Sequence, residues 1–150
     1  MNYKKYITII FEDVSTFGGL VFYVFLCILF LLMGKIDLTI KLLAGIILLY
    51  ILVNISRILY FKERPQKQVY SNFIEKIDAS SFPSMHASRV SFLSFVLVQE
   101  VKDIYLTILF VIMSILVFYS RIYLKKHYLI DIIGGITIGI IVWYFITLII

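Results

Sequence analysis

Long apolar runs separated by short polar stretches dominate this chain of 150 residues. A transmembrane helix needs about 20 predominantly apolar residues, and most of the runs reach or approach that length. They cover residues 18–34, 38–61, 85–98, 104–124 and 128–150. The pattern predicts an all-α fold, a polytopic transmembrane helical bundle with about five spans, built as one membrane-embedded domain over residues 1–150.

Residues 1–17 break this pattern because charged side chains interrupt the apolar ones. Lys4 and Lys5 stand before a group of isoleucines, and Glu12 and Asp13 follow it. Such a mixture favours an amphipathic helix lying in the membrane interface over a further span.

The third run, residues 85–98, is shorter and more polar than the others. It carries Arg89 and three serines. Polar side chains at membrane depth face the interior of a bundle, so we expect the other helices to enclose this one. Ser84 precedes it and is a suitable N-cap.

Gly135 and Gly139 form a small-xxx-small pair on the last predicted span. Such pairs let two helices approach closely. We interpret this one as packing within a single molecule, with dimerisation as the alternative. The sequence does not fix the oligomeric state, and a monomer is compatible with it.

Composition and charge agree with a membrane protein. Hydrophobic residues make up 62% of the chain, whereas soluble domains are close to half apolar. The net charge of +5 would suggest nucleic acid as a partner of a soluble protein, but here the charges cluster between the spans. Membrane lipids with anionic headgroups and a phosphorylated substrate are therefore the expected partners, and nucleic acid is not. Cys27 is the single cysteine, which excludes an intramolecular disulfide and a cysteine metal site.

Alternating spans bring the chemically reactive residues to one side of the membrane. The second and fourth spans end there, and the third and fifth begin there. Both histidines, His86 and His127, lie at this side, with Asp131 and three of the four arginines. Ionisable residues at membrane depth are functional by default, so this side is the candidate site.

The first motif is Arg57, six residues, then Arg64 and Pro65. Residues seven apart lie on one face of a helix, and guanidinium groups fit phosphate oxygens in a bidentate manner. The alternative is that both arginines extend to lipid headgroups without a further role.

The second motif is Phe82-Pro83-Ser84-Met85-His86-Ala87. Pro83 and Ser84 open a helix whose first free N–H groups, together with the helix dipole, favour an anion. His86 lies in that first turn. The alternative is a capped helix with an incidental histidine.

The third motif is Ser120-Arg121, five residues, His127, three residues, Asp131. His127 and Asp131 lie one helical turn apart on the same face. A carboxylate there can accept the proton of one ring nitrogen and direct the other at a target. The alternative is a buried ion pair that only fixes the helix register.

These three motifs together resemble the type-2 phosphatidic acid phosphatases, also called lipid phosphate phosphatases, over residues 57–131. Their pattern is Lys-x6-Arg-Pro, Pro-Ser-Gly-His and Ser-Arg-x5-His-x3-Asp. Here Arg57 replaces the lysine and Met85 replaces the glycine. Family members with six spans have one helix more than this chain, and residues 1–17 would be its remnant.

The resemblance implies a role for each matching residue. Arg57, Arg64, Arg121, Ser84 and the backbone at Met85 would bind the substrate phosphate. His127, oriented by Asp131, would attack phosphorus and form a phosphohistidine, and His86 would protonate the leaving oxygen and later activate water. Ser120 would make an accessory contact. Arg89 lies outside the family's motifs, one helical turn after His86, and we expect it to contact a neighbouring helix, with pairing to Asp131 or contact with a second phosphate as the alternatives. No carboxylate cluster is present to bind a metal, so we expect a metal-independent enzyme without cofactors.

The expected substrate is a lipid phosphate or diphosphate in the cell membrane. The strongly basic site favours a polyprenyl diphosphate, while phosphatidate and phosphatidylglycerol phosphate also fit. A lipid phosphotransferase using the same residues and a non-catalytic lipid-binding protein are the alternatives. Lysines are more numerous on the site's side, which by the positive-inside rule favours the cytoplasm. The resembled family usually faces outward, however, and several of these lysines could serve the substrate, so we expect the outer face.

Overall fold

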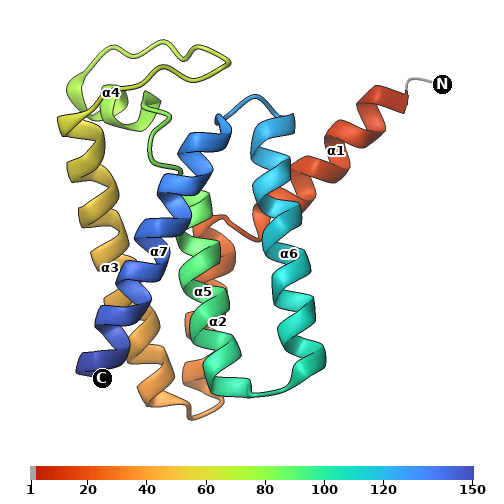
Figure 1. Ribbon diagram of the computed structural model, residues 1–150, viewed down its shortest axis with the longest axis vertical. Coiled ribbons are helices and arrows are strands. Elements are labelled where there is room, and N and C mark those ends of the chain that lie inside the picture. The colour runs from red at the N-terminus through yellow and green to blue at the C-terminus, as the bar shows by residue number, and fades with distance from the viewer. Residues whose placement is uncertain (1–2) are drawn as a thin grey trace.

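The computed structural model describes residues 3–150, and this part of the chain is all-α, as predicted. The helices are α1 (Tyr3–Thr16), α2 (Leu20–Leu32), α3 (Ile36–Leu59), α4 (Phe73–Ala79), α5 (Met85–Val101), α6 (Ile104–Tyr123) and α7 (Leu129–Ile149). Figure 1 shows α5 in the middle of the bundle, and it packs against α3, α6 and α7. The expectation that the short polar helix is enclosed is therefore confirmed.

Three helices, α3, α6 and α7, are long and apolar enough to cross a membrane on their own. The 13 residues of α2 extend only about 20 Å, less than the bilayer core. It joins α1 at a bend of 42°, and the bent pair together meets the requirement for a fourth span. The structure thus joins α1 and α2 into one bent unit, whereas the sequence predicts an interfacial helix over residues 1–17 and a separate span over residues 18–34.

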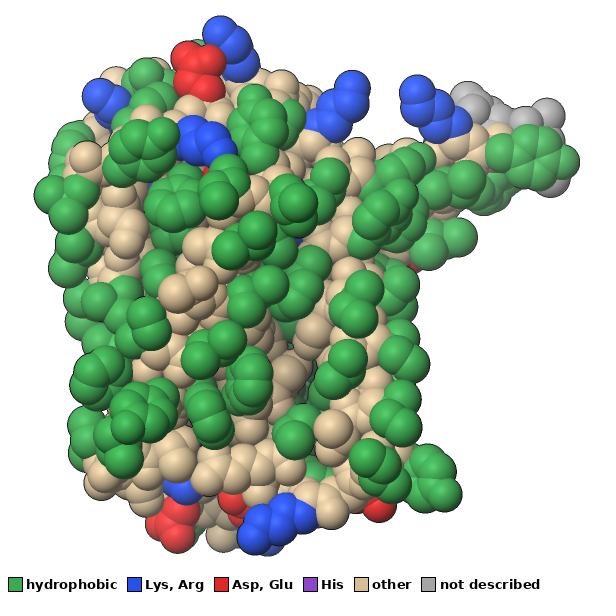
Figure 2. Space-filling model, in the orientation of Figure 1, with side chains coloured by type: hydrophobic (Ala, Val, Ile, Leu, Met, Phe, Trp, Pro, Cys, Tyr) green, Lys and Arg blue, Asp and Glu red, His purple; other side chains and the backbone are tan. Residues whose placement is uncertain are grey.

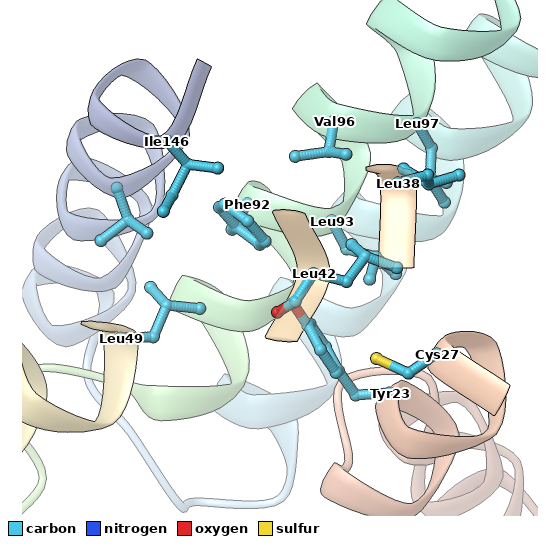
Figure 3. Packing of buried hydrophobic residues seen from close by; sticks show 11 residues of the cluster. Tyr23, Cys27, Leu38, Leu42, Leu49, Phe92, Leu93, Val96, Leu97 and Ile146 are labelled. Carbon is cyan, nitrogen blue, oxygen red and sulfur yellow. The ribbon is translucent and has the colours of Figure 1, made fainter. Parts of the chain in front are cut away.

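The apolar core lies toward the end of the bundle that is remote from the motifs. Figure 3 shows Phe92 among leucines of α3 and α5, with Tyr23 and Cys27 of α2 beside them. The Tyr23 hydroxyl donates a hydrogen bond of 2.7 Å to the carbonyl oxygen of Leu42, which satisfies its polar group inside the core.

Gly135 and Gly139 bring α7 against α5 inside one molecule. A Cβ atom at Gly135 would lie 2.5 Å from the carbonyl oxygen of Ser84, and one at Gly139 would lie 2.7 Å from that of Ser88. Real Cβ atoms do not approach so closely, so only glycine allows this contact. The interpretation as packing within the molecule is confirmed.

The outer surface has the distribution expected of a membrane protein. Apolar side chains cover the middle of the molecule in Figure 2, and charged side chains gather at its two ends. The apolar side chains over the middle of the bundle can therefore contact the lipid tails, and the charged side chains at its ends can contact headgroups and water.

The predicted gathering of the motifs at one end is confirmed. The C-terminal ends of α3 and α6 and the N-terminal ends of α5 and α7 lie together at the end that carries α4, the upper end in Figure 1. The long connection between α3 and α5, which contains α4, covers this end.

Candidate active site

A polar cavity of about 280 Å³ opens among the helix ends at this side of the bundle. All four arginines, both histidines and Met85 line it. These residues come from α3, α5, α6 and the connections after α3 and α6. Seven of the ten residues expected to form the site therefore surround one space.

Each of the four arginines presents an unsatisfied donor. The Nε atoms of Arg57, Arg64, Arg89 and Arg121, and also Nη1 of Arg89, are buried without a hydrogen-bond partner among residues 3–150. A buried donor left unpaired costs about 1–3 kcal/mol, and more when it is charged. Five such donors around one cavity indicate that the site is built to receive an anion with several oxygen atoms.

The remaining guanidinium donors fix the positions of three of the arginines. Arg57 Nη2 donates to the carbonyl oxygen of Pro83 at 3.2 Å, and its Nη1 lies 3.8 Å from Asp78 Oδ1. Arg121 Nη1 donates to the Ser15 hydroxyl at 2.8 Å. Arg64 Nη2 donates to the backbone carbonyl of Asp78. These contacts hold the side chains before a ligand arrives, which is the preorganisation that electrostatic catalysis requires.

His127 lies in the turn between α6 and α7 and is 2% exposed. The carbonyl oxygen of Arg121 accepts the backbone N–H groups of both Lys126 and His127, which closes the turn tightly. The ring atom Nδ1 lies 2.8 Å from the carbonyl oxygen of Ser81. Because a carbonyl oxygen can only accept, Nδ1 carries the proton and Nε2 keeps its lone pair. This tautomer is the one that a nucleophilic Nε2 requires.

Asp131 does not make the contact with His127 that the motif predicts. Its Oδ2 atom lies 3.9 Å from His127 Nδ1, beyond a hydrogen bond. Instead Oδ1 accepts from Lys62 Nζ at 2.6 Å, and Oδ2 accepts from the backbone N–H of Tyr128 at 2.8 Å. The carboxylate is fully buried, and an ammonium group and a helix N-terminus compensate its charge better than a neutral imidazole does. The carbonyl of Ser81 takes over the orienting hydrogen bond.

The connection after α3 holds the Ser81 carbonyl in place. The N–H of Ser81 donates to the carbonyl oxygen of Lys62 at 2.7 Å, and its hydroxyl donates to that of Glu63 at 3.1 Å. The N–H of Lys62 donates to the Ser80 hydroxyl at 3.3 Å. Lys62 thus binds the Asp131 carboxylate with its side chain and the Ser80–Ser81 segment with its backbone.

Besides Asp131, two expected site residues do not line the cavity, Ser84 and Ser120. Both are fully buried. The Ser84 hydroxyl accepts the N–H of Ala87 as the N-cap of α5, and the Ser120 hydroxyl donates to the carbonyl oxygen of Val117 at 2.6 Å. Both hydroxyls thus bond to the backbone of their own helices. The predicted cap at Ser84 is confirmed.

His86 lies where the polar cavity meets a second, open groove of about 670 Å³. The walls of this groove include Leu20, Val21, Phe22 and Phe25 of α2, and Val21 is 85% exposed at the outer surface. The groove connects the histidine with the apolar surface of the bundle.

The sequence did not single out several residues of the site. Tyr50 and Asn54 line the cavity and precede Arg57 by seven and three positions, which places them on its face of α3. The spacing of these two polar residues relative to Arg57, within an otherwise apolar helix, could have identified them from the sequence. No local pattern marks Lys62 or the carbonyl of Ser81, because both act through contacts between distant segments.

Burial, with the positive charges of Arg121 and Arg64, lowers the pKa of His127 to about 3. The charged imidazolium is disfavoured, so the ring stays neutral at pH 7 and becomes charged only as the pH falls toward 3, well below the ordinary value of about 6.5. We expect ring ¹⁵N NMR of the His86→Asn variant, in which His127 is the remaining histidine, to show no titration between pH 8 and pH 5. A midpoint near 6.5 would contradict a buried, neutral ring.

A family model described as the PAP2 superfamily matches residues 38–150. Among solved structures, the first transmembrane phosphatidylglycerolphosphate phosphatase of PAP2 type from Bacillus subtilis superposes with a TM-score of 0.76 at 18% sequence identity, over 96% of this chain and 76% of that one. No curated protein matches the sequence. At this identity the structural likeness concerns the fold.

Proposed function

The chain belongs to the PAP2 superfamily, and we propose that it is a membrane phosphatase that acts on a lipid phosphate through a phosphohistidine formed on His127. The resemblance inferred from the three motifs is confirmed at the level of the superfamily. The observation that carries the proposed mechanism is the neutral His127 ring, which has its proton on Nδ1 and lies in a cavity lined by four arginines with unsatisfied donors.

In the first step the terminal phosphoryl group occupies the cavity between Arg57, Arg64 and Arg121. His127 Nε2 attacks phosphorus, while Nδ1–H donates to the carbonyl of Ser81 and stabilises the positive charge that develops on the ring. The N–P bond forms as the bond from phosphorus to the lipid oxygen breaks. His86 gives its proton to that oxygen, and the lipid product leaves.

In the second step a water molecule attacks the phosphohistidine from the space that the lipid has left. His86, now lacking its proton, accepts one from the water. The N–P bond breaks, and inorganic phosphate leaves with the enzyme restored. Phosphoryl transfer depends mostly on positioning and charge stabilisation, and the arginines can supply the positive charge that a divalent cation supplies in other enzymes. We therefore propose a metal-independent reaction without cofactors.

The lipid part of the substrate lies in the groove that opens from His86. Its apolar walls and exposed rim let a chain remain in the bilayer while the phosphate enters the cavity. A polyprenyl diphosphate is the favoured substrate. Phosphatidylglycerol phosphate, which the similar solved structure is named for, and phosphatidate are the other candidates.

We expect detergent-purified protein to release phosphate from a polyprenyl diphosphate, and more slowly from phosphatidate, in the presence of EDTA. The ratio of the two values of kcat/KM identifies the substrate class. Loss of activity in EDTA that Mg²⁺ restores would contradict charge stabilisation by arginine alone. No release from either lipid by folded protein would favour a binding protein, whereas phosphate recovered on added glycerol would identify the alternative phosphotransferase.

We propose that the site faces the outside of the cell. The lysine excess at this end is a weak signal for the cytoplasm, because Lys62 pairs with Asp131, Lys67 with Glu63, and Lys76 lies over the ring of Phe61. These lysines have partners within the protein and are less available to set the topology.

A membrane-impermeant thiol reagent added to intact cells is expected to label Lys67→Cys and leave Lys102→Cys unlabelled. The two positions are exposed at opposite ends of the bundle. Cys27 is 6% exposed and gives a low background. Labelling of the second variant alone would place the site in the cytoplasm.

A further inference from the structure

Arg89 lies beyond the three motifs but lines the same cavity. It follows His86 by three residues on α5, about 4.5 Å further along the helix axis, toward the interior of the bundle. The residue is 5% exposed. Its Nη2 atom approaches Nδ1 of His86 at 3.5 Å, while Nε and Nη1 have no partner among residues 3–150.

The surroundings of Arg89 do not explain its charge. Among the ion pairs within the described residues none includes Arg89, and the nearest aromatic ring, that of Tyr50, lies 6.0 Å from Cζ. A guanidinium that only joined two helices would be partnered, because an unpaired buried charge costs several kcal/mol. Two unpartnered donors on a side chain that lines a polar cavity indicate that the partner is a ligand.

The charge of the cavity exceeds what one phosphoryl group balances. Four guanidinium groups line it, and Asp78 is the one carboxylate in the lining within residues 3–150; its side chain is 78% exposed and largely solvated. A phosphate monoester carries about −1.5 to −2 at pH 7. A second phosphoryl group would supply the missing negative charge.

Building on the proposed function, we propose that Arg89, together with Tyr50 and Asn54, binds a second phosphoryl group on the leaving-group side of His86, which makes lipid diphosphates the preferred substrates. Arg57, Arg64 and Arg121 take the terminal phosphoryl group beside His127. The bridging oxygen faces His86, and the inner phosphoryl group lies next to Arg89, one helical turn deeper. The Tyr50 hydroxyl and the Asn54 amide add neutral donors there.

The reaction follows from this placement. His127 Nε2 bonds to the terminal phosphorus, the bond from that phosphorus to the bridging oxygen breaks, and His86 gives its proton to the oxygen. The inner phosphoryl group leaves as a lipid monophosphate held by Arg89. Water then releases the terminal group as inorganic phosphate, so each diphosphate yields one lipid monophosphate and one phosphate.

The test compares a fifteen-carbon isoprenyl diphosphate with its monophosphate on the full-length protein in detergent. We expect Arg89→Gln to lower the ratio of kcat/KM for the diphosphate to that for the monophosphate by about tenfold or more. Arg89→Lys should recover part of the ratio, because it restores the charge. Lys67→Gln removes an exposed charge outside the cavity and should leave the ratio unchanged.

An equal loss of kcat/KM on both substrates in Arg89→Gln would show a structural role for Arg89. It would contradict the second subsite but not the proposed phosphatase activity. Absence of phosphate release by the unaltered protein would instead contradict the proposed function itself.

A measurement on the unaltered protein covers the case in which Arg89→Gln does not fold. Methylenebisphosphonate, which is not hydrolysed, should inhibit monophosphate hydrolysis with an inhibition constant at least about tenfold below that of methylphosphonate. Equal inhibition constants would contradict a site for two phosphoryl groups.

Discussion

His127→Ala should abolish phosphate release, lowering kcat by about 10⁴-fold or more, the scale seen when a covalent nucleophile is removed. The reason is geometric. His127 Nδ1 donates to the carbonyl oxygen of Ser81 at 2.8 Å, which leaves the lone pair of Nε2 free to attack phosphorus. Arginine side chains around it bind phosphate but are always protonated, so they cannot substitute as nucleophiles. The measurement is phosphate release from the preferred lipid substrate.

The matched control for this variant is His86→Ala. With an aryl phosphate, whose leaving group needs little protonation, His86→Ala should still form the phosphohistidine and then hydrolyse it slowly. Acid-labile ³²P should therefore accumulate on His86→Ala and be absent from His127→Ala. Acid-labile ³²P on both variants would show that a residue other than His127 is the nucleophile.

Lys62→Met should destabilise the protein by about 3 kcal/mol, at the lower end of the cost of breaking a buried ion pair. The substitution leaves the Asp131 carboxylate, which is 0% exposed, with the N–H of Tyr128 as its remaining donor. The lower end applies because the Lys62 side chain is 23% exposed, which lets water replace part of the ammonium. Unfolding of the purified protein in detergent, followed by circular dichroism, measures the change.

A double-mutant cycle separates the ion pair from other effects of Lys62. Lys62→Met combined with Asp131→Asn should recover most of the lost stability, since no charge remains buried. Lys67→Met breaks an exposed pair with Glu63 of similar length, 3.1 Å, and should cost less than about 1 kcal/mol. Equal costs for the two lysine variants would show that solvent, not Lys62, compensates Asp131.

The sequence by itself determined which segments become helices in the membrane and which residues gather at one end. Apolar length separates the spans from the polar connections, because unsatisfied backbone groups are excluded from hydrocarbon. Alternating direction then brings Arg57, His86 and His127 to the same side, whatever the details of packing. The serines of α5 also predicted its central place, since polar groups at membrane depth avoid lipid.

Only the tertiary structure decided which partner each polar group of the site takes. The spacing of four residues placed Asp131 near His127, but a short spacing fixes a face of a helix and not a hydrogen bond. Lys62, sixty-nine positions before Asp131 in the chain, and the carbonyl of Ser81 compete for the same groups. Their approach depends on how the connection after α3 folds over the bundle.

The same reason applies to two serines of the motifs and to the bend at the start of the chain. Ser84 and Ser120 match the motif, yet backbone partners one turn away occupy their hydroxyls. The bend between α1 and α2 accompanies the packing of α1 against α6 and of α2 against α3, which composition does not encode. Local patterns report what a segment requires from its surroundings, namely burial, an anion or a cap. Which atoms meet that requirement is decided by segments far apart in the chain, and only their packing brings them together.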